Sequence, residues 1–295
     1  MEYKGYIINE DGKSIKVTNI KDFNPVHTFE CGQCFRWRRQ KDGSYTGVVR
    51  EKVVNLRFYD GILEISNTNL DEFKDIWFDY FDLGRDYTDI KQKIMKDEVM
   101  EKAIAFGSGI RLLKQDLWEM IVSFIFSANN RIPMIMKTIE AVCRKYGNKI
   151  EYDGNTYFTF PSIDALSATD VQELEVCRGG FRCKYVVETA RKIASGEVDI
   201  KELNNLSADK AGEVLMKLPG VGPKVSDCIL LYSGTKYEVF PTDVWVKRVM
   251  QELYFKREAS IREIRKFAQE YFGELAGFAQ QYLFYYAREN GIGAG

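Results

Sequence analysis

The segment Leu-Pro-Gly-Val-Gly-Pro-Lys, residues 218–224, separates two stretches of helical character. Residues 207–217 precede it, and Ser207 is a suitable N-cap for a helix there. The Pro-Gly-Val-Gly run stops that helix, because glycine and proline are the strongest breakers of regular structure. A second helix is predicted to begin near Pro223, since proline is favoured at the first helical position and apolar residues then recur at helical spacing. The sequence therefore predicts two helices joined by a glycine-rich hairpin.

This hairpin has the features of a phosphate-binding corner. Glycine lets the turn adopt a positive φ and lets another backbone approach closely. The N–H groups that begin the second helix have no partners within it, and the helix dipole attracts anions to that end. We therefore expect the backbone at Gly220, Gly222 and Val225 to face a phosphate. A packing corner between two helices uses the same residue types, so the hairpin alone does not separate the two interpretations.

A lysine in the first turn of the second helix favours the functional interpretation. Lys224 stands where the helix dipole disfavours a cation. Together with partial burial, the dipole is expected to push the lysine towards its neutral amine, which is the nucleophilic form. Further along, Phe-Pro-Thr-Asp at residues 240–243 reads as another helix start, with Asp243 at or near the cap. A carboxylate in that position can cap its helix and also face an activated amine.

These residues resemble a known family signature. The hairpin, its lysine and the later aspartate are similar to the helix-hairpin-helix, Gly/Pro-Asp (HhH-GPD) signature of base-excision DNA glycosylases. A lysine in the hairpin is typical of the bifunctional branch, which combines glycosylase and lyase activities. The match is specific, because it fixes two glycines, a lysine and an aspartate at the spacing of the family. The resemblance implies that Lys224 and Asp243 are catalytic, and further segments narrow it to the 8-oxoguanine DNA glycosylases.

Two of these segments lie in the first half of the chain. Residues 32–37 resemble a Gly-Gln-x-Phe-Arg-Trp block of the family, and residues 111–116 resemble a second block. Normal guanine has an acceptor at N7, whereas 8-oxoguanine carries a hydrogen there. A backbone carbonyl aimed at N7 would therefore attract the lesion and repel the normal base. The family assigns this role to the glycine matched by Gly32, while a turn glycine between strands is the alternative.

The last predicted helix carries an amide on an apolar face. Gln280 lies among apolar residues at helical spacing, and an unpaired polar group there costs about 1–3 kcal/mol. Either the protein satisfies this amide internally or a ligand does. In the family this glutamine reads the Watson–Crick edge of the flipped base. The aromatic residue matched by Phe284 stacks on one face of that base, and the residue matched by Cys228 lies on its other face. A plain buried cysteine would look the same in the sequence.

Other positions match family residues that contact the DNA strands around the lesion. Asn129 matches the family wedge that fills the space of the extruded nucleotide, and Arg182 matches the arginine that pairs with the orphaned cytosine. A loop residue and a surface charge are the alternatives. Eukaryotic relatives have arginine where this chain has Met134, tyrosine where it has Phe181 and histidine where it has Trp245. The differences at Met134 and Phe181 predict weaker discrimination of the opposite base. The phosphate-side role of the histidine cannot be assigned to Trp245.

Composition limits these interpretations without excluding them. The chain has 295 residues, a net charge of −1 and a pI of about 6.1, so it lacks the overall basic character of many nucleic-acid binders. Binding to DNA needs only a local cationic face. No secretory signal layout and no run of 18 apolar residues is present. We therefore expect a cytoplasmic protein that acts on chromosomal DNA, without membrane contact and as a monomer.

Six scattered cysteines suit reduced thiols in such a compartment. Residues 31–34 form a Cys-x-x-Cys pair, which leaves a redox or zinc site as an alternative. A second closely spaced ligand pair is missing, and His27 is the single histidine, so neither a metal nor another cofactor is expected. Since no cysteine follows Cys228, the C-terminal four-cysteine iron–sulfur loop of the related endonuclease III branch is excluded.

The pattern of residues predicts an α+β fold. Residues 3–67 alternate and are rich in strand formers, with turn residues between runs, which is typical of an antiparallel sheet. Helical spacing takes over from residue 69. We expect a sheet domain with trailing helices at 1–110 and a helical glycosylase body at 111–295. Predicted helices lie at residues 116–127, 131–145, 182–195, 207–217, 224–233, 243–254, 261–272 and 276–289, and the first of these, apolar nearly all round, should be buried centrally.

The resemblance implies a bifunctional enzyme that acts on double-stranded DNA containing 8-oxoguanine. Its lysine would form a Schiff base with the sugar, and β-elimination would nick the strand. Two alternatives stay open. A glycosylase for oxidised pyrimidines would share Lys224 and Asp243 but not the set of Gly32, Gln280 and Phe284. A non-enzymatic helix-hairpin-helix module would keep the glycines and have no use for the lysine–aspartate pair.

Overall fold

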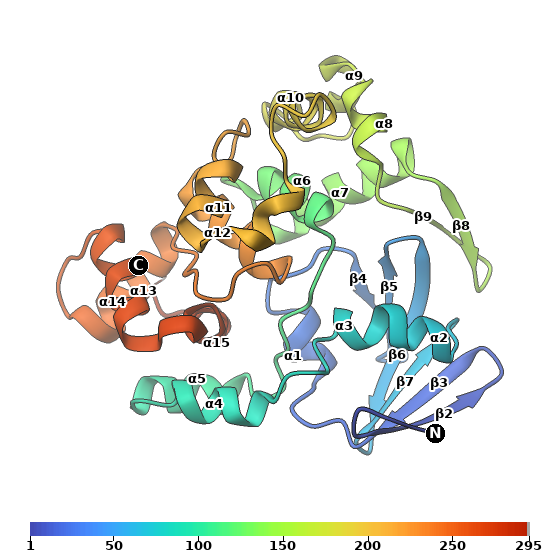
Figure 1. The fold of residues 1–295 in the computed structure, drawn as a ribbon, viewed down its shortest axis with the longest axis horizontal. Helices are drawn as coiled ribbons and strands as arrows, with labels where there is room; N and C mark the ends of the chain where they lie inside the picture. Colours follow the sequence, from blue (N-terminus) through green and yellow to red (C-terminus); the bar gives the residue numbers. More distant parts are fainter. Residues whose placement is uncertain (294–295) are drawn as a thin grey trace.

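A computed structural model describes residues 1–293 and confirms the predicted α+β architecture (Figure 1). A seven-stranded antiparallel sheet lies at one end of the molecule, and the rest is mostly helical. The strands follow the order β1-β2-β3-β7-β6-β5-β4. Their bounds are β1 Glu2–Tyr3, β2 Tyr6–Asp11, β3 Ser14–Thr18, β4 Trp37–Arg39, β5 Tyr45–Val49, β6 Lys52–Tyr59 and β7 Ile62–Ser66.

Turn chemistry and alternation explain this sheet. Between β6 and β7, Asp60 and Gly61 both have positive φ, as a two-residue hairpin turn requires. Alternate residues of β3, β6 and β7 point into a core that a short helical segment covers. That segment comprises α2 (Leu70–Glu72), the π-helical turn Phe73–Trp77 and α3 (Phe78–Tyr80). This segment thus covers one face of the sheet, and one end of the sheet abuts the helical body (Figure 1).

The helical body contains the predicted helices at nearly the predicted positions. Every residue from 118 to 126 in α6 is buried, which confirms α6 as the central helix. The helix expected at 243–254 ends earlier, at Met250, and continues as a π-helical turn to Phe255. The bounds are α6 Leu117–Ser127, α7 Ile132–Tyr146, α8 Ile163–Ser167, α9 Val171–Glu175, α10 Arg182–Ala194, α11 Ala208–Leu215, α12 Pro223–Tyr232, α13 Val244–Met250, α14 Ile261–Phe272 and α15 Ala276–Glu289.

Helices α4 (Tyr87–Ile94) and α5 (Glu98–Phe106) follow the sheet in sequence but pack in the core of the helical body. In Figure 1 they lie beside α15, and α5 contacts α15 along its length. The division at residue 110 stays a prediction, because the helical core includes Cys31 and Phe35 and the core of the sheet includes Leu113. Within residues 1–293, no helix combines the length and apolar character that crossing a membrane requires.

Three local features differ from the sequence prediction. Within the region predicted as sheet, β4 begins only at Trp37, because the residues before it turn into the helical body, where Phe35 packs against Phe124. A short helix, α1 (Pro25–Phe29), precedes that turn, and its N-cap Asn24 accepts hydrogen bonds from two backbone N–H groups. A further hairpin pairs β8 (Lys149–Tyr152) with β9 (Asn155–Phe158).

Candidate active site

The hairpin between α11 and α12 places glycine where other residues would clash. Ser207 caps α11 as predicted, accepting from Lys210 N at 3.4 Å. Gly220 has φ +80°, and an added Cβ would lie 2.7 Å from the ring of Tyr185. Gly222 is the N-cap of α12, with no side-chain cap among the described residues and open space beside its Cα. The first amides of α12 are therefore left for an external acceptor.

A cavity of about 520 Å³ opens beside this helix start, a size typical of small-molecule sites, which span roughly 300–1,000 Å³. Residues from the turn after α1 and from α6, α12, α13 and α15 line it. The predicted residues that it brings together are Gly32, Asn129, Lys224, Cys228, Asp243, Gln280 and Phe284, and Trp245, to which the sequence assigned no role, lines it as well. The other predicted residues, which do not line it, are Met134, Phe181, Arg182, Gly220, Gly222 and Val225.

We call Lys224 and Asp243 the amine end of the cavity. Lys224 is the second residue of α12, and its Nζ lies 5.7 Å from the ring centre of Phe124. Asp243 caps α13, because its Oδ1 accepts from Val246 N at 2.7 Å. The capping interpretation of Asp243 is thus confirmed, and the same carboxylate faces the cavity that holds the lysine.

The expected neutral state of Lys224 is wrong for the resting protein. Its pKa is raised, first by attraction to the side chain of Cys228, to which it is hydrogen-bonded, and also by Asp243, against burial, which lowers it. Burial in turn raises the pKa of the Cys228 thiol to about 11, and attraction to Lys224 opposes this effect. Sequence reasoning weighed the helix dipole and burial but not the effect of Cys228 and Asp243 on the pKa of the lysine.

Gly32, Gln280 and Phe284 form what we call the base end. Gly32 has φ +93°, and an added Cβ would lie 3.2 Å from Cε1 of Phe284. A side chain here would strain the backbone and press on that ring, so glycine serves a close approach at this position. Gln280 is 2% exposed and donates from Nε2 to Pro241 O at 3.2 Å. Its Oε1 has no hydrogen-bond partner within residues 1–293, a cost that a ligand would offset.

Trp245 lies between the two ends. It follows Asp243 closely on α13 and meets Phe284 edge-to-face, with ring centres 5.2 Å apart and an interplanar angle of 87°. Edge-to-face pairs contribute about 0.5–1.5 kcal/mol beyond their buried area. The tryptophan therefore supports the ring of Phe284. It occupies the position at which the eukaryotic relatives have a histidine.

The predicted wedge residue sits on a strained loop that an arginine braces. Asn129 follows α6 and has φ +48°. Arg182, the first residue of α10, donates to Ala128 O at 2.7 Å and to Asn129 O at 2.8 Å. Beside this loop, Phe181 is 60% exposed and Met134 is 41% exposed. Arg182 is thus a support of the loop in the unbound protein, with two large apolar side chains presented to solvent nearby.

Sequence reasoning missed two residues that contact this site. Phe124 lies under Lys224, but α6 is apolar nearly all round, so its pattern does not distinguish a cavity wall from the core. Arg288 reaches the turn after α1 from the last turn of α15, and its Nη2 donates to Glu30 O at 2.5 Å. A charged residue at a helix end is usual, so no signal in the sequence separates it from a surface arginine.

The alternative metal or redox site finds no support in the part of the chain that the structure describes. Cys31 and Cys34 are buried free thiols that donate to separate backbone carbonyls, those of Thr28 and Phe29. Burial raises the pKa of Cys31 to about 11, which makes it unreactive. Within residues 1–293, no group of three or more His, Cys, Asp or Glu side chains is arranged to hold a metal ion.

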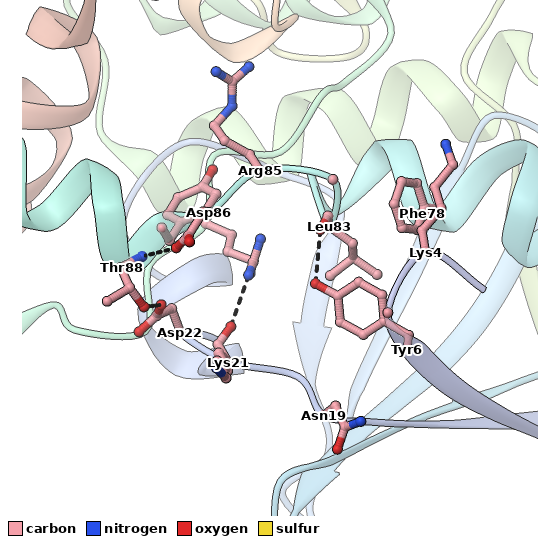
Figure 2. Close-up of a pocket in the computed structure, with 14 residues that line it drawn as sticks. Lys4, Tyr6, Asn19, Lys21, Asp22, Phe78, Leu83, Arg85, Asp86 and Thr88 are labelled. Carbon is pink, nitrogen blue, oxygen red and sulfur yellow. Dashed lines mark hydrogen bonds between the residues drawn. The ribbon is translucent and has the colours of Figure 1, made fainter. Parts of the chain in front are cut away.

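A second cavity, of about 550 Å³, lies at the edge of the sheet and shares no lining residue with the first cavity (Figure 2). Its charged groups already have partners. Asp22 accepts from Lys91 and Thr88, and Arg85 pairs with Asp82. The guanidinium of Arg111 donates to two backbone carbonyls and lies over a tyrosine ring. These ion pairs and hydrogen bonds engage most of the charged groups of this cavity with one another, although Arg111 Nε has no partner within residues 1–293.

Comparison with known proteins agrees with the site. Residues 15–121 match the N-terminal domain of 8-oxoguanine DNA glycosylase, and residues 122–274 match the HhH-GPD superfamily of base excision DNA repair proteins. A probable N-glycosylase/DNA lyase of Methanothermobacter thermautotrophicus is 36% identical over 72% of this chain and 74% of its own length.

Two solved structures are similar over nearly the whole chain. One is the Clostridium acetobutylicum 8-oxoguanine glycosylase/lyase in complex with double-stranded DNA containing cytosine opposite 8-oxoguanine. It has a TM-score of 0.95 and 47% identity and covers 97% of this chain and 99% of that one. The other, MBOgg1 in complex with a low-affinity DNA ligand, has a TM-score of 0.95 and 53% identity, with the same coverage.

Proposed function

Because this chain belongs to the HhH-GPD superfamily of base excision DNA repair proteins, we propose that it excises 8-oxoguanine from double-stranded DNA and then nicks the strand. It would do so in the cytoplasm, on chromosomal DNA, as a monomer. One observation carries the proposal. A single cavity holds a primary amine and a carboxylate at one end and a base-sized set of polar and aromatic groups at the other.

DNA binding uses groups at the start of α12, on α10 and on the loop after α6, of which Asn129 also lines the cavity. The open amides at Gly222 and Val225, with the turn at Gly220, donate to a backbone phosphate at the start of α12. Asn129 enters the space that the extruded nucleotide leaves, and Arg182 faces the base that has lost its partner. Flipping the nucleotide costs a few kcal/mol of unstacking, which these contacts offset.

The base end then reads the flipped base. The carbonyl of Gly32 accepts the N7 hydrogen that only the oxidised base carries. Gln280 bonds the Watson–Crick edge, which gives its unpartnered Oε1 a donor. Phe284 and Cys228 cover the two faces. An undamaged guanine would place its N7 acceptor against a carbonyl acceptor, and this repulsion favours the lesion.

At the amine end, Lys224 must lose its proton before it attacks, because an ammonium has no free electron pair. Its nitrogen then bonds to C1′ of the sugar while the bond to the base breaks. The base leaves with the bonding electrons and takes up a proton. Asp243 stabilises the positive charge that develops on the sugar. After the nitrogen loses a proton, its lone pair expels O4′ from C1′. The sugar ring opens, O4′ takes up a proton, and a Schiff base between Lys224 and C1′ remains. Loss of a C2′ proton with departure of the 3′ phosphate is then the β-elimination that cleaves the strand 3′ to the lesion.

Borohydride trapping tests the proposal. Wild-type protein with an 8-oxoguanine:cytosine duplex should give a covalent adduct, and Lys224→Gln should give none while still binding DNA. Folded protein that binds the duplex without forming an adduct or excising the base would support the non-enzymatic module instead. Equal excision of 8-oxoguanine and undamaged guanine would contradict the base end separately.

A further inference from the structure

Arg288 contacts both parts of the base end without lining the cavity itself. From the last turn of α15 its Nη2 donates to Glu30 O at 2.5 Å. Its Nη1 lies 3.2 Å from the position that a Cβ on Gly32 would occupy. Its guanidinium carbon is 5.7 Å from the ring centre of Phe284. One side chain therefore touches the turn that carries the discriminating carbonyl and the ring on which the base stacks.

These two parts come from opposite ends of the chain, so only tertiary contacts set their relative position. A buried contact already joins them, because Gln281 Nε2 donates to Cys31 O at 3.1 Å. Arg288 adds a second contact one residue earlier in the same turn. Arginine suits this position, since its rigid planar fork can donate along its edge while its face covers a ring. A lysine has one compact charge and cannot do both.

The alternative is a surface cation at a helix end. Arg288 also donates from Nε to Glu289 Oε1 at 2.8 Å, and a positive charge is favourable in the last turn of a helix. An exposed ion pair contributes little, however, and it does not require the contact with Glu30. The hydrogen bond to the turn and the contact with Phe284 are the features that a surface role leaves unexplained.

We propose that Arg288 is a positioning residue for recognition of 8-oxoguanine. It holds the carbonyl of Gly32 in the plane of a base stacked on Phe284. The inference rests on the proposed function, and Arg288 touches neither the sugar nor the glycosidic bond. Its removal should therefore impair base recognition and leave the amine end intact.

Two duplexes separate these effects in single-turnover assays. One contains 8-oxoguanine opposite cytosine, and the other contains a preformed abasic site, which needs the amine but has no base to read. Arg288→Ala should slow excision of 8-oxoguanine about 10- to 100-fold, as small misplacements at reacting centres do. It should leave nicking of abasic DNA within about twofold and lower the ratio of 8-oxoguanine to guanine excision. Arg288→Lys, which keeps the helix-end charge and guards against misfolding, should show the same selective loss.

Glu289→Gln is the matched control, because it removes the surface partner of Arg288 and leaves the contact with Glu30. Its rates should stay within about twofold of the wild type. If Arg288→Ala and Arg288→Lys slow both substrates equally, or slow neither, the inference is overturned while the proposed function stands. If the wild type neither excises 8-oxoguanine nor nicks abasic DNA, the proposed function fails, and the inference fails with it.

Discussion

The amine end and the base end share one cavity but are encoded differently. Lys224 and Asp243 belong to two short motifs, a glycine-rich hairpin and a helix cap, whose local structure follows from a few neighbouring residues. The base end joins Gly32, in a turn near the N-terminus, to Gln280 and Phe284 in the last helix. Its geometry exists only after the whole chain has folded. Chemistry that depends on the amine end should therefore survive changes that abolish recognition of the base, and the predictions below test this separation.

The largest effect is expected for Lys224→Gln. Without the amine no Schiff base forms, so excision of 8-oxoguanine and nicking of abasic DNA should both fall about 10⁴-fold or more. Single-turnover assays on the two duplexes measure this. DNA affinity, followed by gel shift, should change little. Substantial nicking of abasic DNA by the variant would show that another residue supplies the amine.

The second largest effect is expected for loss of the negative charge of Asp243, which faces the lysine. Asp243→Asn keeps an oxygen that can accept from Val246 N, but it loses the negative charge, so excision should fall about 10²- to 10³-fold. Asp243→Ala removes the cap as well and should lower the free energy of unfolding by about 1 kcal/mol relative to Asp243→Asn. Denaturant titration and single-turnover kinetics separate the two roles. Equal activity of Asp243→Asn and wild type would leave the carboxylate with a capping role only.

Changes at the base end should slow excision of 8-oxoguanine but not nicking of abasic DNA. Gln280→Ala and Phe284→Ala remove an edge contact and a stacking surface, and excision of 8-oxoguanine should drop about 10- to 100-fold in each. Nicking of preformed abasic DNA should stay within about twofold. Parallel losses on both duplexes would mean that the two ends of the cavity are not separable.

The pH dependence of nicking probes the amine alone. Since the pKa of Lys224 is raised above its ordinary value, the ammonium dominates from pH 6 to pH 9, and the reactive amine fraction grows about tenfold per pH unit. Nicking of abasic DNA should therefore accelerate as pH rises through this window. Asp243→Asn removes one cause of the raised pKa, so its profile should level off at lower pH. A flat wild-type profile would contradict an ammonium resting state.

The smallest effect concerns the base opposite the lesion. Met134 and Phe181 lie outside the cavity, beside the loop of Asn129, and neither carries the polar group found in eukaryotic relatives. Excision opposite adenine should therefore be less than about tenfold slower than opposite cytosine, because no second directional hydrogen bond selects the base. Met134→Arg with Phe181→Tyr should increase the preference for cytosine. A wild-type preference of a hundredfold or more would refute this expectation.

The sequence predicted the elements with strong local signals. The helices α14 and α15 lie where periodicity placed them, and strands β1 to β7 lie within the region predicted as sheet. The β8–β9 hairpin was missed, although Asp153 and Gly154 occupy a two-residue turn with positive φ at both positions, a recognised hairpin signal. The flanking residues are exposed or half-buried on both strands, so the alternation that marks a packed strand is weak there.

For the site, local patterns predicted residue identity better than charge state. Gln280 was identifiable because an amide on an apolar face needs a partner. The resting charge of Lys224 was not, because it depends on Asp243, whose proximity is tertiary, as well as on Cys228 one turn further along α12. Arg288 could not be found at all, since its contact with Glu30 joins residues at opposite ends of the chain. Local physics thus encodes the reactive groups, and packing decides how they are tuned.

The most direct test is to locate the bond that borohydride reduction makes permanent. The trapped complex with 8-oxoguanine DNA can be digested with nuclease and protease and sequenced by mass spectrometry. We predict a reduced sugar remnant on Nζ of Lys224 and on no other amine. A remnant on a different lysine or on the N-terminus, with Lys224 unmodified, would contradict the assignment of the amine end.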